Sequence, residues 1–428
     1  MRLYRALASL ALAAYAPFAL ARSLAGKRRF GDIRGRLGKR PYPDLGGGVW
    51  IHAVSVGEVG VARNLIRSLR PKLPGRPLGV SVTTAAGREL AAGSLSAEAA
   101  IFAFPFDLAG AVERSLSRTR PAVIVLVETE IWPLFLDRAA SLGIPVALVN
   151  GRISSASFAR YRLAGRFFRR TLSRIALFAM QSDEDARRIE ALGAPRERIV
   201  NLGNIKYDLP EPPPFPDSRR LAETAAGRPL LVAGSTGEGE EALVLDAWSA
   251  LPRRPLLLLA PRRPERFDEV ARLGVSRGLT VVRRSRVDNL QPATDNPPDV
   301  YLLDSIGELA SVYREAALAF VGGSLIDTGG QNPIEAWAAG VPVLAGPHME
   351  NFREIAARGQ ELGFLTLARD ASDLSLRIAE ALADPGETSR RGAAAERFVA
   401  ANRGAAERTS AAIVSLLPAL SGRRASAP

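Results

Sequence analysis

The sequence contains no cysteine and only two histidines, His52 and His348. Without cysteine there is no disulfide, no thiolate nucleophile and no cysteine-ligated zinc site, and two histidines cannot supply a site with three histidine ligands. Acidic residues are also in deficit, because 44 aspartates and glutamates stand against 57 lysines and arginines, for a formal net charge of +13. This balance favours anionic partners: nucleic acid, phosphorylated small molecules or an acidic membrane surface.

Aromatic residues make up only 6% of the chain, and no basic stretch is interleaved with aromatic side chains of the kind that stack on bases. Nucleic acid is therefore the least favoured of the three anionic partners. The length of 428 residues, with 47% hydrophobic residues, is enough for two domains that each have a core.

The first 22 residues contain an apolar run over residues 7–21, preceded by Arg2 and Arg5. The run is shorter than the roughly 20 residues of a full membrane span, and Ala19-Leu20-Ala21 resembles a signal-peptidase site, so cleavage and export is one interpretation. The basic cluster between Arg22 and Arg40, opposed only by Asp32, favours another. Such a cluster resists translocation and is attracted to anionic headgroups, so we predict an uncleaved membrane anchor helix over residues 1–22 with the body in the cytoplasm.

Short apolar runs alternate with amphipathic stretches from residue 49 to residue 208, a pattern typical of a parallel, doubly wound α/β sheet. Five prolines in residues 209–216 cannot lie inside a helix or a strand, and they indicate a linker over 209–217. Beyond it the alternation resumes, with a helical pattern over 389–417. We predict a first domain over 23–208 and a second over 218–420. The expected strands are 49–54, 78–83, 101–103, 122–126, 146–150, 177–180 and 199–202, then 230–233, 256–260, 279–282, 300–303, 317–321 and 343–345.

Glu58 lies where the first predicted strand turns into a helix, at the carboxyl edge of the sheet. Ligands of open α/β sheets bind at that edge, and the helix dipole favours an ionised acid in the first turn. A catalytic base is one interpretation of this position. The other is a capping box between Ser55 and Glu58, which needs no chemistry. In the same way Asp183-Glu184-Asp185 suggests either a metal site or, as we favour, the first turn of a helix capped by Ser182.

Two stretches of the second domain have the composition of an anion site. Gly234-Ser235-Thr236-Gly237-Glu238-Gly239-Glu240-Glu241 follows a strand and opens a helix, but it lacks the Gly-Lys-Ser/Thr of a P-loop. The next strand ends at Arg262-Arg263, whose guanidinium groups suit phosphate or carboxylate, although a solvated loop is an equal alternative.

A third stretch runs from Gly322-Gly323-Ser324 through Gly329 to His348, with two glycine-rich turns around a helix that carries Glu335. The glycines allow the backbone to approach a nucleotide phosphate, and a carboxylate in the first turns of the helix can accept both ribose hydroxyls. The alternative for Glu335 is a helix N-terminal charge without a ligand. The recurrence of these turns at one sheet edge favours a nucleotide site.

Five ordered segments together resemble the Kdo transferases of lipopolysaccharide assembly, which transfer 3-deoxy-D-manno-oct-2-ulosonic acid (Kdo) from CMP-Kdo to lipid A precursors such as lipid IVA. The resemblance covers nearly the whole chain. It implies a GT-B fold, with two Rossmann-like domains facing a central cleft, the donor on the second and the acceptor on the first. It also implies metal-independent inverting transfer without a cofactor, at the cytoplasmic side of the inner membrane, with Glu58 as general base. The segments are His52 to Glu58, Glu128 to Pro133, Asn150 to Ser154, Gly203 to Asp208 and Gly329 to Phe352.

Carried onto this sequence, the resemblance implies a set of substrate-binding positions. Arg262 and Lys206 are the candidates to hold the donor charges, and an ordinary ionised carboxylate can suffice as the base, so Glu58 need not have a raised pKa. Glu128 and Glu130 either line the acceptor cleft or cap a helix. The rival prediction is another GT-B enzyme that uses a UDP-sugar, either a glycosyltransferase or an epimerase. Gly237, Arg263 and Gln331 stand where histidine is expected. The substrate-binding positions are Ser55, Gly57, Lys206, Ser235, Thr236, Arg262, Gly323, Gly330, Asn332, Glu335, Pro347 and Asn351.

Overall fold

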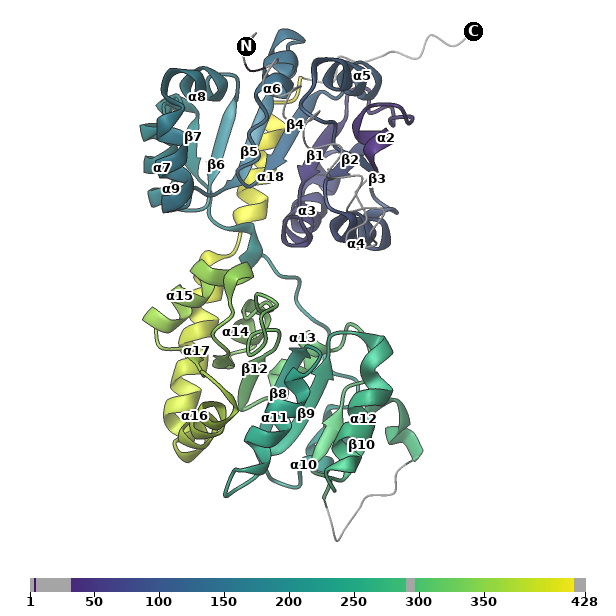
Figure 1. Ribbon diagram of the computed structural model, residues 1–428, viewed down its shortest axis with the longest axis vertical. Coiled ribbons are helices and arrows are strands. Elements are labelled where there is room, and N and C mark those ends of the chain that lie inside the picture. The colour runs from purple at the N-terminus through teal and green to yellow at the C-terminus, as the bar shows by residue number, and fades with distance from the viewer. Residues whose placement is uncertain (1–3, 5–31, 290–296, 419–428) are drawn as a thin grey trace. The chain divides into compact units, whose positions relative to one another are not determined.

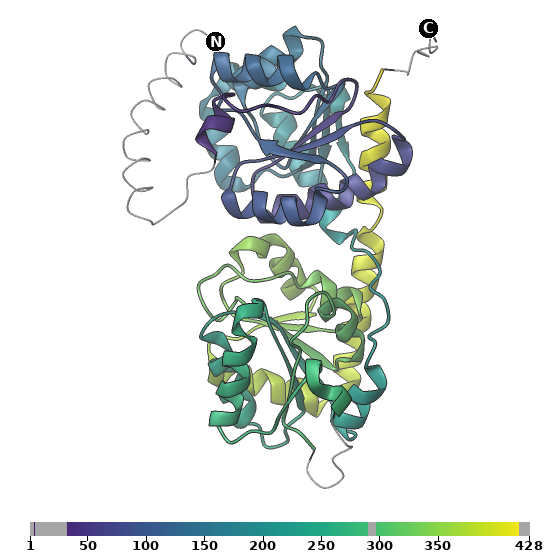
Figure 2. The same ribbon diagram turned by 90° about the vertical axis from the view of Figure 1, so that its right-hand side faces the viewer.

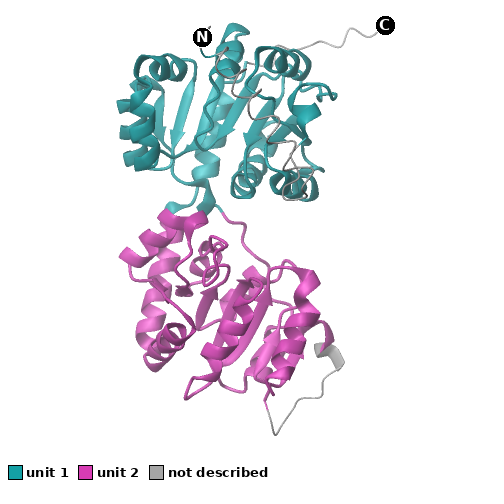
Figure 3. Ribbon diagram, viewed as in Figure 1, with its two compact units in different colours: residues 1–208, 402–428 teal, residues 209–401 magenta. Residues whose placement is uncertain are grey.

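The computed structural model describes residue 4 and residues 32–289 and 297–418 of the chain. Two compact units make up the protein, residues 1–208 with 402–428 and residues 209–401 (Figure 3). The first boundary, between Asp208 and Leu209, falls where the proline-rich stretch begins. Each unit is built around one seven-stranded parallel sheet, which confirms the predicted fold class of two doubly wound α/β domains.

The first sheet has the strand order β3-β2-β1-β4-β5-β6-β7. Both faces of its central strands are buried: Val49 and Ile51 belong to one core cluster and Trp50, between them, to the other. This explains why these strands are continuous apolar runs rather than alternating ones. The strands are β1 (Val49–Ala53), β2 (Leu78–Val82), β3 (Ala100–Ala103), β4 (Val123–Val127), β5 (Val146–Gly151), β6 (Leu177–Met180) and β7 (Ile199–Asn201).

The second sheet has the order β10-β11-β9-β8-β12-β13-β14. The predicted strands are confirmed to within a few residues, and β14 was not predicted. The strands are β8 (Leu230–Thr236), β9 (Leu256–Pro261), β10 (Val281–Arg283), β11 (Val300–Leu302), β12 (Leu318–Val321), β13 (Val343–Ala345) and β14 (Leu365–Leu367).

Helices cover both faces of each sheet (Figures 1 and 2). In the first unit these are α2 (Ile33–Arg36), α3 (Val56–Leu69), α4 (Ala85–Leu95), α5 (Ala109–Thr119), α6 (Pro133–Ser141), α7 (Ser155–Leu163), α8 (Gly165–Leu172), α9 (Asp183–Ala191) and α18 (Ala405–Ser415). In the second they are α10 (Ser218–Ala225), α11 (Glu240–Ser249), α12 (Phe267–Ser276), α13 (Leu309–Val312), α14 (Ile334–Ala338), α15 (Arg353–Glu361), α16 (Ala371–Ala383) and α17 (Pro385–Asn402).

The last helix corrects the predicted end of the second domain. Gly404, whose backbone is in the left-handed region with a φ of 86°, separates α17 from α18. α18 belongs to the first unit rather than to a second domain that runs to residue 420. Ile413 is fully buried in the core that also contains residues of α3. Asp208 holds the turn, because its carboxylate accepts hydrogen bonds from the backbone N–H groups of Gly404 and Ala406, both at 2.5 Å. The apolar face of α18 therefore completes the first unit, not the second.

The predicted anchor over residues 1–22 lies outside the described residues except for Tyr4. No helix in the described part of the chain is both long and apolar enough to cross a membrane. The predicted helix cap at Ser182 is confirmed, since its hydroxyl accepts a hydrogen bond from the N–H of Asp185 in the first turn of α9.

Candidate active site

The strand order of each sheet reverses at one place, and the predicted site residues gather there. In the first sheet this point lies between β1 and β4, and in the second between β8 and β12. Loops at the carboxyl ends of such strands diverge and leave room for a ligand. Glu58 follows β1 and Glu128 follows β4, whereas Ser235 is the last residue but one of β8 and Gly322 follows β12.

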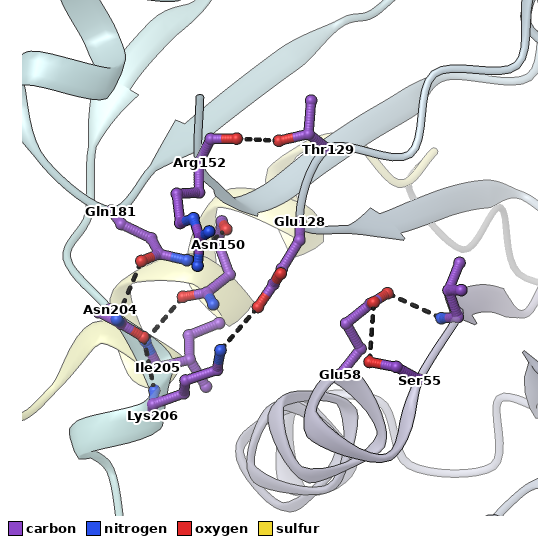
Figure 4. A network of polar contacts seen from close by, with 11 residues as sticks. Ser55, Glu58, Glu128, Thr129, Asn150, Arg152, Gln181, Asn204, Ile205 and Lys206 are labelled. Carbon is purple, nitrogen blue, oxygen red and sulfur yellow. Dashed lines mark hydrogen bonds and ion pairs between the residues drawn. The ribbon is translucent and has the colours of Figure 1, made fainter. Parts of the chain in front are cut away.

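Glu58 folds back onto the turn between β1 and α3 and is 8% exposed. Its carboxylate accepts hydrogen bonds from the backbone N–H of Val54 at 2.7 Å and from the hydroxyl of Ser55 at 3.0 Å (Figure 4). Ser55 is the N-cap of α3, but its hydroxyl accepts no hydrogen bond from the first turn of that helix. The reciprocal capping box is therefore absent, and Ser55 acts instead as a donor to the carboxylate. Gly57, in the same turn, is exposed.

The surroundings of Glu58 raise its pKa to about 8, chiefly because the carboxylate is buried and also because Glu128 is close. The hydrogen bonds from Val54 and Ser55 lower the pKa but do not offset the burial. The sequence did not require a raised pKa at Glu58, and the structure shows that it is raised. The helix dipole favours an ionised acid here, but its effect at a helix end is smaller than the desolvation of the carboxylate.

Lys206 forms an ion pair with Glu128 within the first unit, with 2.9 Å between Nζ and Oε1 (Figure 4). Lys206 lies on the short 3₁₀ helix η3 (Ile205–Tyr207), which Asn150 holds by accepting the Ile205 N–H at 2.9 Å. The side-chain N–H of Asn204 donates a hydrogen bond of 2.9 Å to the side-chain oxygen of Gln181, which supports the same turn. The structure thus brings Lys206 to the Glu128 carboxylate at the edge of the first sheet.

Glu130 has a pKa raised to about 7 by burial, opposed by a hydrogen bond of 3.0 Å from the indole N–H of Trp132. Three carboxylates, those of Glu58, Glu128 and Glu130, therefore share one sheet edge with Lys206, which pairs with Glu128. Glu128 also has a positive φ of 58°, a conformation that costs a non-glycine residue energy and that recurs at functional sites. Asn150 at the end of β5 and Ser235 at the end of β8 share this conformation.

His52, which begins the segment that leads to Glu58, is fully buried inside the sheet. Its ring stacks on Phe104 at 3.7 Å and its Nδ1 lies 3.0 Å from the hydroxyl of Ser81. Burial lowers its pKa to about 3, so the imidazole stays neutral. His52 is therefore part of the core and not an acid–base group.

In the second unit, a glutamate that the sequence analysis did not select organises the predicted anion loops. Glu240, at the start of α11, is fully buried. Its two oxygens accept four backbone N–H groups, those of Gly237 at 3.0 Å, Gly323 at 2.6 Å, and Ser324 and Leu325 at 2.9 Å each. The loops after β8 and β12 are thus joined by one carboxylate, and amides that looked available for a phosphate are already engaged. Any contact of Gly323 with a ligand must use atoms other than its N–H.

The two loops also touch directly. A Cβ at Gly322 would lie 2.6 Å from the Cα of Thr236, so only glycine permits this approach. Thr236 is buried and donates to Glu241 at 3.0 Å, and Glu241 pairs in turn with Arg266 at 2.6 Å. Thr236 is therefore tied into the fold, whereas Ser235 beside it is partly exposed.

Arg262 and Glu335 form the charged part of the second site. The pKa of Arg262 is lowered by partial burial, and the Glu335 carboxylate acts in the opposite direction. The backbone N–H of Arg262 donates to Thr236 at 3.0 Å, which fixes the end of β9 beside the β8 loop. Arg263, the next residue, is exposed, as the side chain of Arg262 is.

The loop before α14 is held by Asn351, whose side-chain amide donates to the carbonyls of Thr328 at 3.1 Å and Gly330 at 3.3 Å. Asn332 starts α14 by accepting the N–H of Ile334 at 3.1 Å. Both asparagines thus shape the loop that leads to Glu335. Gln331 lies next to Gly323, and Pro347 is exposed after β13.

Two other features of the second unit lie apart from these groups. Asp327, His348 and Glu350 bring ligand atoms within 4.8 Å of one another, but all three side chains are open to solvent and we assign no metal to them. A cavity of about 240 Å³ opens at the amino ends of β12 and β13, the opposite edge of the sheet, so we do not place the donor there.

Comparison with known proteins decides the family. Residues 26–209 match the family described as "3-Deoxy-D-manno-octulosonic-acid transferase (kdotransferase)", and residues 283–398 match "Glycosyl transferases group 1". The 3-deoxy-D-manno-octulosonic acid transferase of Bordetella pertussis is 37% identical over 388 residues, 88% of this chain and 89% of that protein. The Haemophilus influenzae protein of the same name is 34% identical over 368 residues, 84% and 85% of the two chains. This chain belongs to the Kdo transferase family.

The Kdo transferase assignment makes the protein a glycosyltransferase of lipopolysaccharide biosynthesis, as the five sequence segments predicted. Solved structures agree on the fold. The UDP-GlcNAc 2-epimerase from Neisseria meningitidis, solved with UDP-GlcNAc, superposes with a TM-score of 0.51 over 86% of this chain and 99% of that one, at 13% identity. At that identity the likeness establishes only the GT-B architecture.

Sequence reasoning gave no role to Glu240 or Gln181, and it named Asn150 and Asn204 only as members of the family segments. The sequence contained a signal for a turn before Glu240, because Gly237 and Gly239 precede it. In the structure Gly239 has a positive φ of 85° at the start of α11. Nothing in the residue pattern showed that a charged side chain there would be fully buried.

Proposed function

We propose that this Kdo transferase uses CMP-Kdo as donor and a phosphorylated lipid A precursor, lipid IVA, as acceptor, with inversion at the anomeric carbon. The observation that carries the proposal is the pair formed by Glu58 and Glu128 at the strand-order reversal of the first sheet. Glu58 is buried, has few hydrogen-bond donors and has a pKa of about 8. A base whose pKa lies near the operating pH is well suited to general base catalysis.

In the proposed reaction an acceptor hydroxyl oxygen attacks the anomeric carbon of Kdo while the bond from that carbon to the CMP phosphate breaks. The hydroxyl proton passes to the ionised carboxylate of Glu58, and CMP leaves with the bonding electrons. Inversion follows because the hydroxyl attacks the face opposite CMP. Charge develops on the leaving phosphate, so a guanidinium such as Arg262 stabilises the transition state more than the ground state.

The remaining predicted positions divide between the two substrates. Glu335 would accept the ribose hydroxyls, and the loops held by Asn332 and Asn351 would line the donor. Ser55 and Gly57 surround the base. Lys206, which was predicted to hold donor charge, is paired with Glu128 in the first unit, so we propose instead that it balances that charge beside the acceptor. On the donor side Ser235, Gly330 and Pro347 would contact CMP-Kdo, whereas Thr236 is tied to Glu241 and Gly323 would contact the donor only through atoms other than its N–H.

We further propose that the protein works without a metal or other cofactor, at the cytoplasmic side of the inner membrane, where a phosphorylated lipid acceptor and the basic N-terminal region would meet. The net charge of +13 supports an anionic lipid surface as partner.

Mass spectrometry of lipid IVA after incubation with CMP-Kdo and the purified protein tests the proposal. We expect the acceptor mass to increase by whole Kdo residues, in buffer that contains a chelator as well as without it. Unchanged acceptor, together with tighter binding of UDP than of CMP, would contradict the proposal and favour a UDP-sugar enzyme.

A further inference from the structure

The proposed reaction assigns no role to the hairpin formed by α7 and α8 of the first unit. It begins four residues after the end of β5 and lies to one side of the first unit (Figure 1). None of the nine residues of α7 is buried. At the junction of the two helices Leu163 is 89% exposed, more than any other large hydrophobic residue in the described part of the chain. Phe158 and Tyr161 of α7 are partly buried and pack against the core of the first unit, so the helix is attached by one face and leaves Leu163 uncovered.

Charge on the hairpin has one sign. Residues 155–172 contain five arginines and no acidic residue. All five are exposed, and none forms an ion pair with any residue that the structure describes. On α8, Arg166, Arg169 and Arg170 have the spacing that places them on one face, opposite the buried Phe168 and Leu172. The five are Arg160, Arg162, Arg166, Arg169 and Arg170.

A contact from the predicted anchor reaches the same hairpin. The ring of Tyr4 lies 5.4 Å from that of Phe167 on α8, and its hydroxyl donates to Asp107 at 2.9 Å. Residues 1–22 are the stretch for which the sequence predicts membrane association. The hairpin and Tyr4 are thus neighbours in the first unit.

We infer that the α7–α8 hairpin is a membrane-docking surface, which inserts Leu163 among lipid chains while its arginines bind the headgroups of an anionic bilayer. An exposed apolar residue surrounded by arginines is typical of segments that lie in the interfacial region of a membrane. The inference rests on the proposed function, because a lipid acceptor requires the first unit to reach a bilayer. α7 starts just beyond the β5 end that carries Asn150, so docking of this surface brings the acceptor edge close to the lipid.

The absence of cysteine makes a direct test practical. Leu163→Cys in the full chain provides one attachment point for an environment-sensitive fluorophore, and Leu376→Cys on α16, where the leucine is 52% exposed, provides the matched control. We expect vesicles of phosphatidylglycerol and phosphatidylcholine to increase the emission at position 163 at least threefold with a blue shift. Position 376 and vesicles of phosphatidylcholine alone should give little change.

An unchanged signal at position 163 on protein that sediments with the vesicles would overturn the inference. Two further outcomes would also overturn it. A blue-shifted signal before vesicles are added would mean that another segment of the chain covers Leu163, and a signal that rises with protein concentration alone would mean that a second copy does.

Charge reversal tests the headgroup contact separately. The triple variant Arg166→Glu, Arg169→Glu and Arg170→Glu should bind anionic vesicles roughly tenfold more weakly or worse. Arg253→Glu, Arg272→Glu and Arg397→Glu, three exposed arginines of the second unit, change the net charge equally and should bind nearly as the wild type does. Equal losses in both variants would contradict docking by the hairpin. Kdo transfer to detergent-dispersed acceptor should stay within about twofold in each, so a failure of the proposed function would be seen separately, in the wild type.

Discussion

Two buried glutamates occupy corresponding places in the two units and are hydrogen-bonded very differently. Glu58 follows the first strand of its sheet, and Glu240 follows the first strand of the other, both in the first turn of a helix. Glu240 accepts four backbone N–H groups, whereas Glu58 accepts one N–H and one hydroxyl. A buried carboxylate that accepts many hydrogen bonds connects the segments that donate them and stabilises the fold. One that accepts few hydrogen bonds keeps lone pairs available to accept a proton. The fold places an acid at both points, but only the first unit leaves it reactive.

The largest expected effect is on the rate of transfer by a Glu58→Gln variant. The amide cannot accept the hydroxyl proton, so we expect kcat to fall by about a thousandfold, within the range for removal of a general base. Initial rates with CMP-Kdo and detergent-dispersed lipid IVA measure it. Glu98→Gln, an exposed glutamate of the same unit, is the control and should keep wild-type activity.

Substitution of Glu240, the corresponding glutamate of the second unit, should affect stability more than catalysis. An amide at position 240 supplies only one acceptor oxygen, so Glu240→Gln leaves buried N–H groups without a partner and should cost about 3 kcal/mol of unfolding free energy. Glu58→Gln should cost about 1 kcal/mol or less, because fewer donors depend on it. Urea unfolding followed by tryptophan fluorescence compares the unfolding free energies of the two variants. A larger loss of unfolding free energy in Glu58→Gln would contradict the structural role that we assign to Glu240.

A smaller effect separates the two arginines at the end of β9. Both arginines expose much of their side chain, but the Glu335 carboxylate acts on Arg262, whose pKa it works to raise. Arg262→Ala should raise the KM for CMP-Kdo about tenfold or more, as expected for loss of a charge-assisted contact, and Arg263→Ala should change it less than about twofold. Similar KM values for the two variants would remove Arg262 from the donor site.

The sequence was sufficient to predict the alternation of strands and helices, because buried parallel strands are apolar runs and prolines mark the linker. It was also sufficient to place Glu58, Arg262 and Glu335 at sheet edges. The position of α18 was not predictable in this way, since the pattern of a helix shows which face is apolar but not which of two sheets it covers.

The protonation and pairing of the site residues depend on contacts between residues that are far apart in the chain, and the sequence pattern does not give these contacts. The raised pKa of Glu58 comes from burial and from Glu128, which is 70 positions away in the chain. The pairing of Lys206 with Glu128 and the engagement of the glycine-loop amides by Glu240 are likewise long-range contacts. Residue types could therefore nominate the site, but the protonation of its base required the fold.

The pH dependence of transfer is the most direct test of this account. Because Glu58 must be ionised to accept a proton and its pKa is about 8, kcat/KM should rise with pH through a midpoint near 8. Glu128→Gln removes a nearby negative charge and leaves Lys206 without that partner, and both changes favour ionisation of Glu58. The midpoint should therefore move down by about one pH unit. A flat profile between pH 6 and 9, or an upward shift in Glu128→Gln, would contradict the assignment of Glu58 as the base.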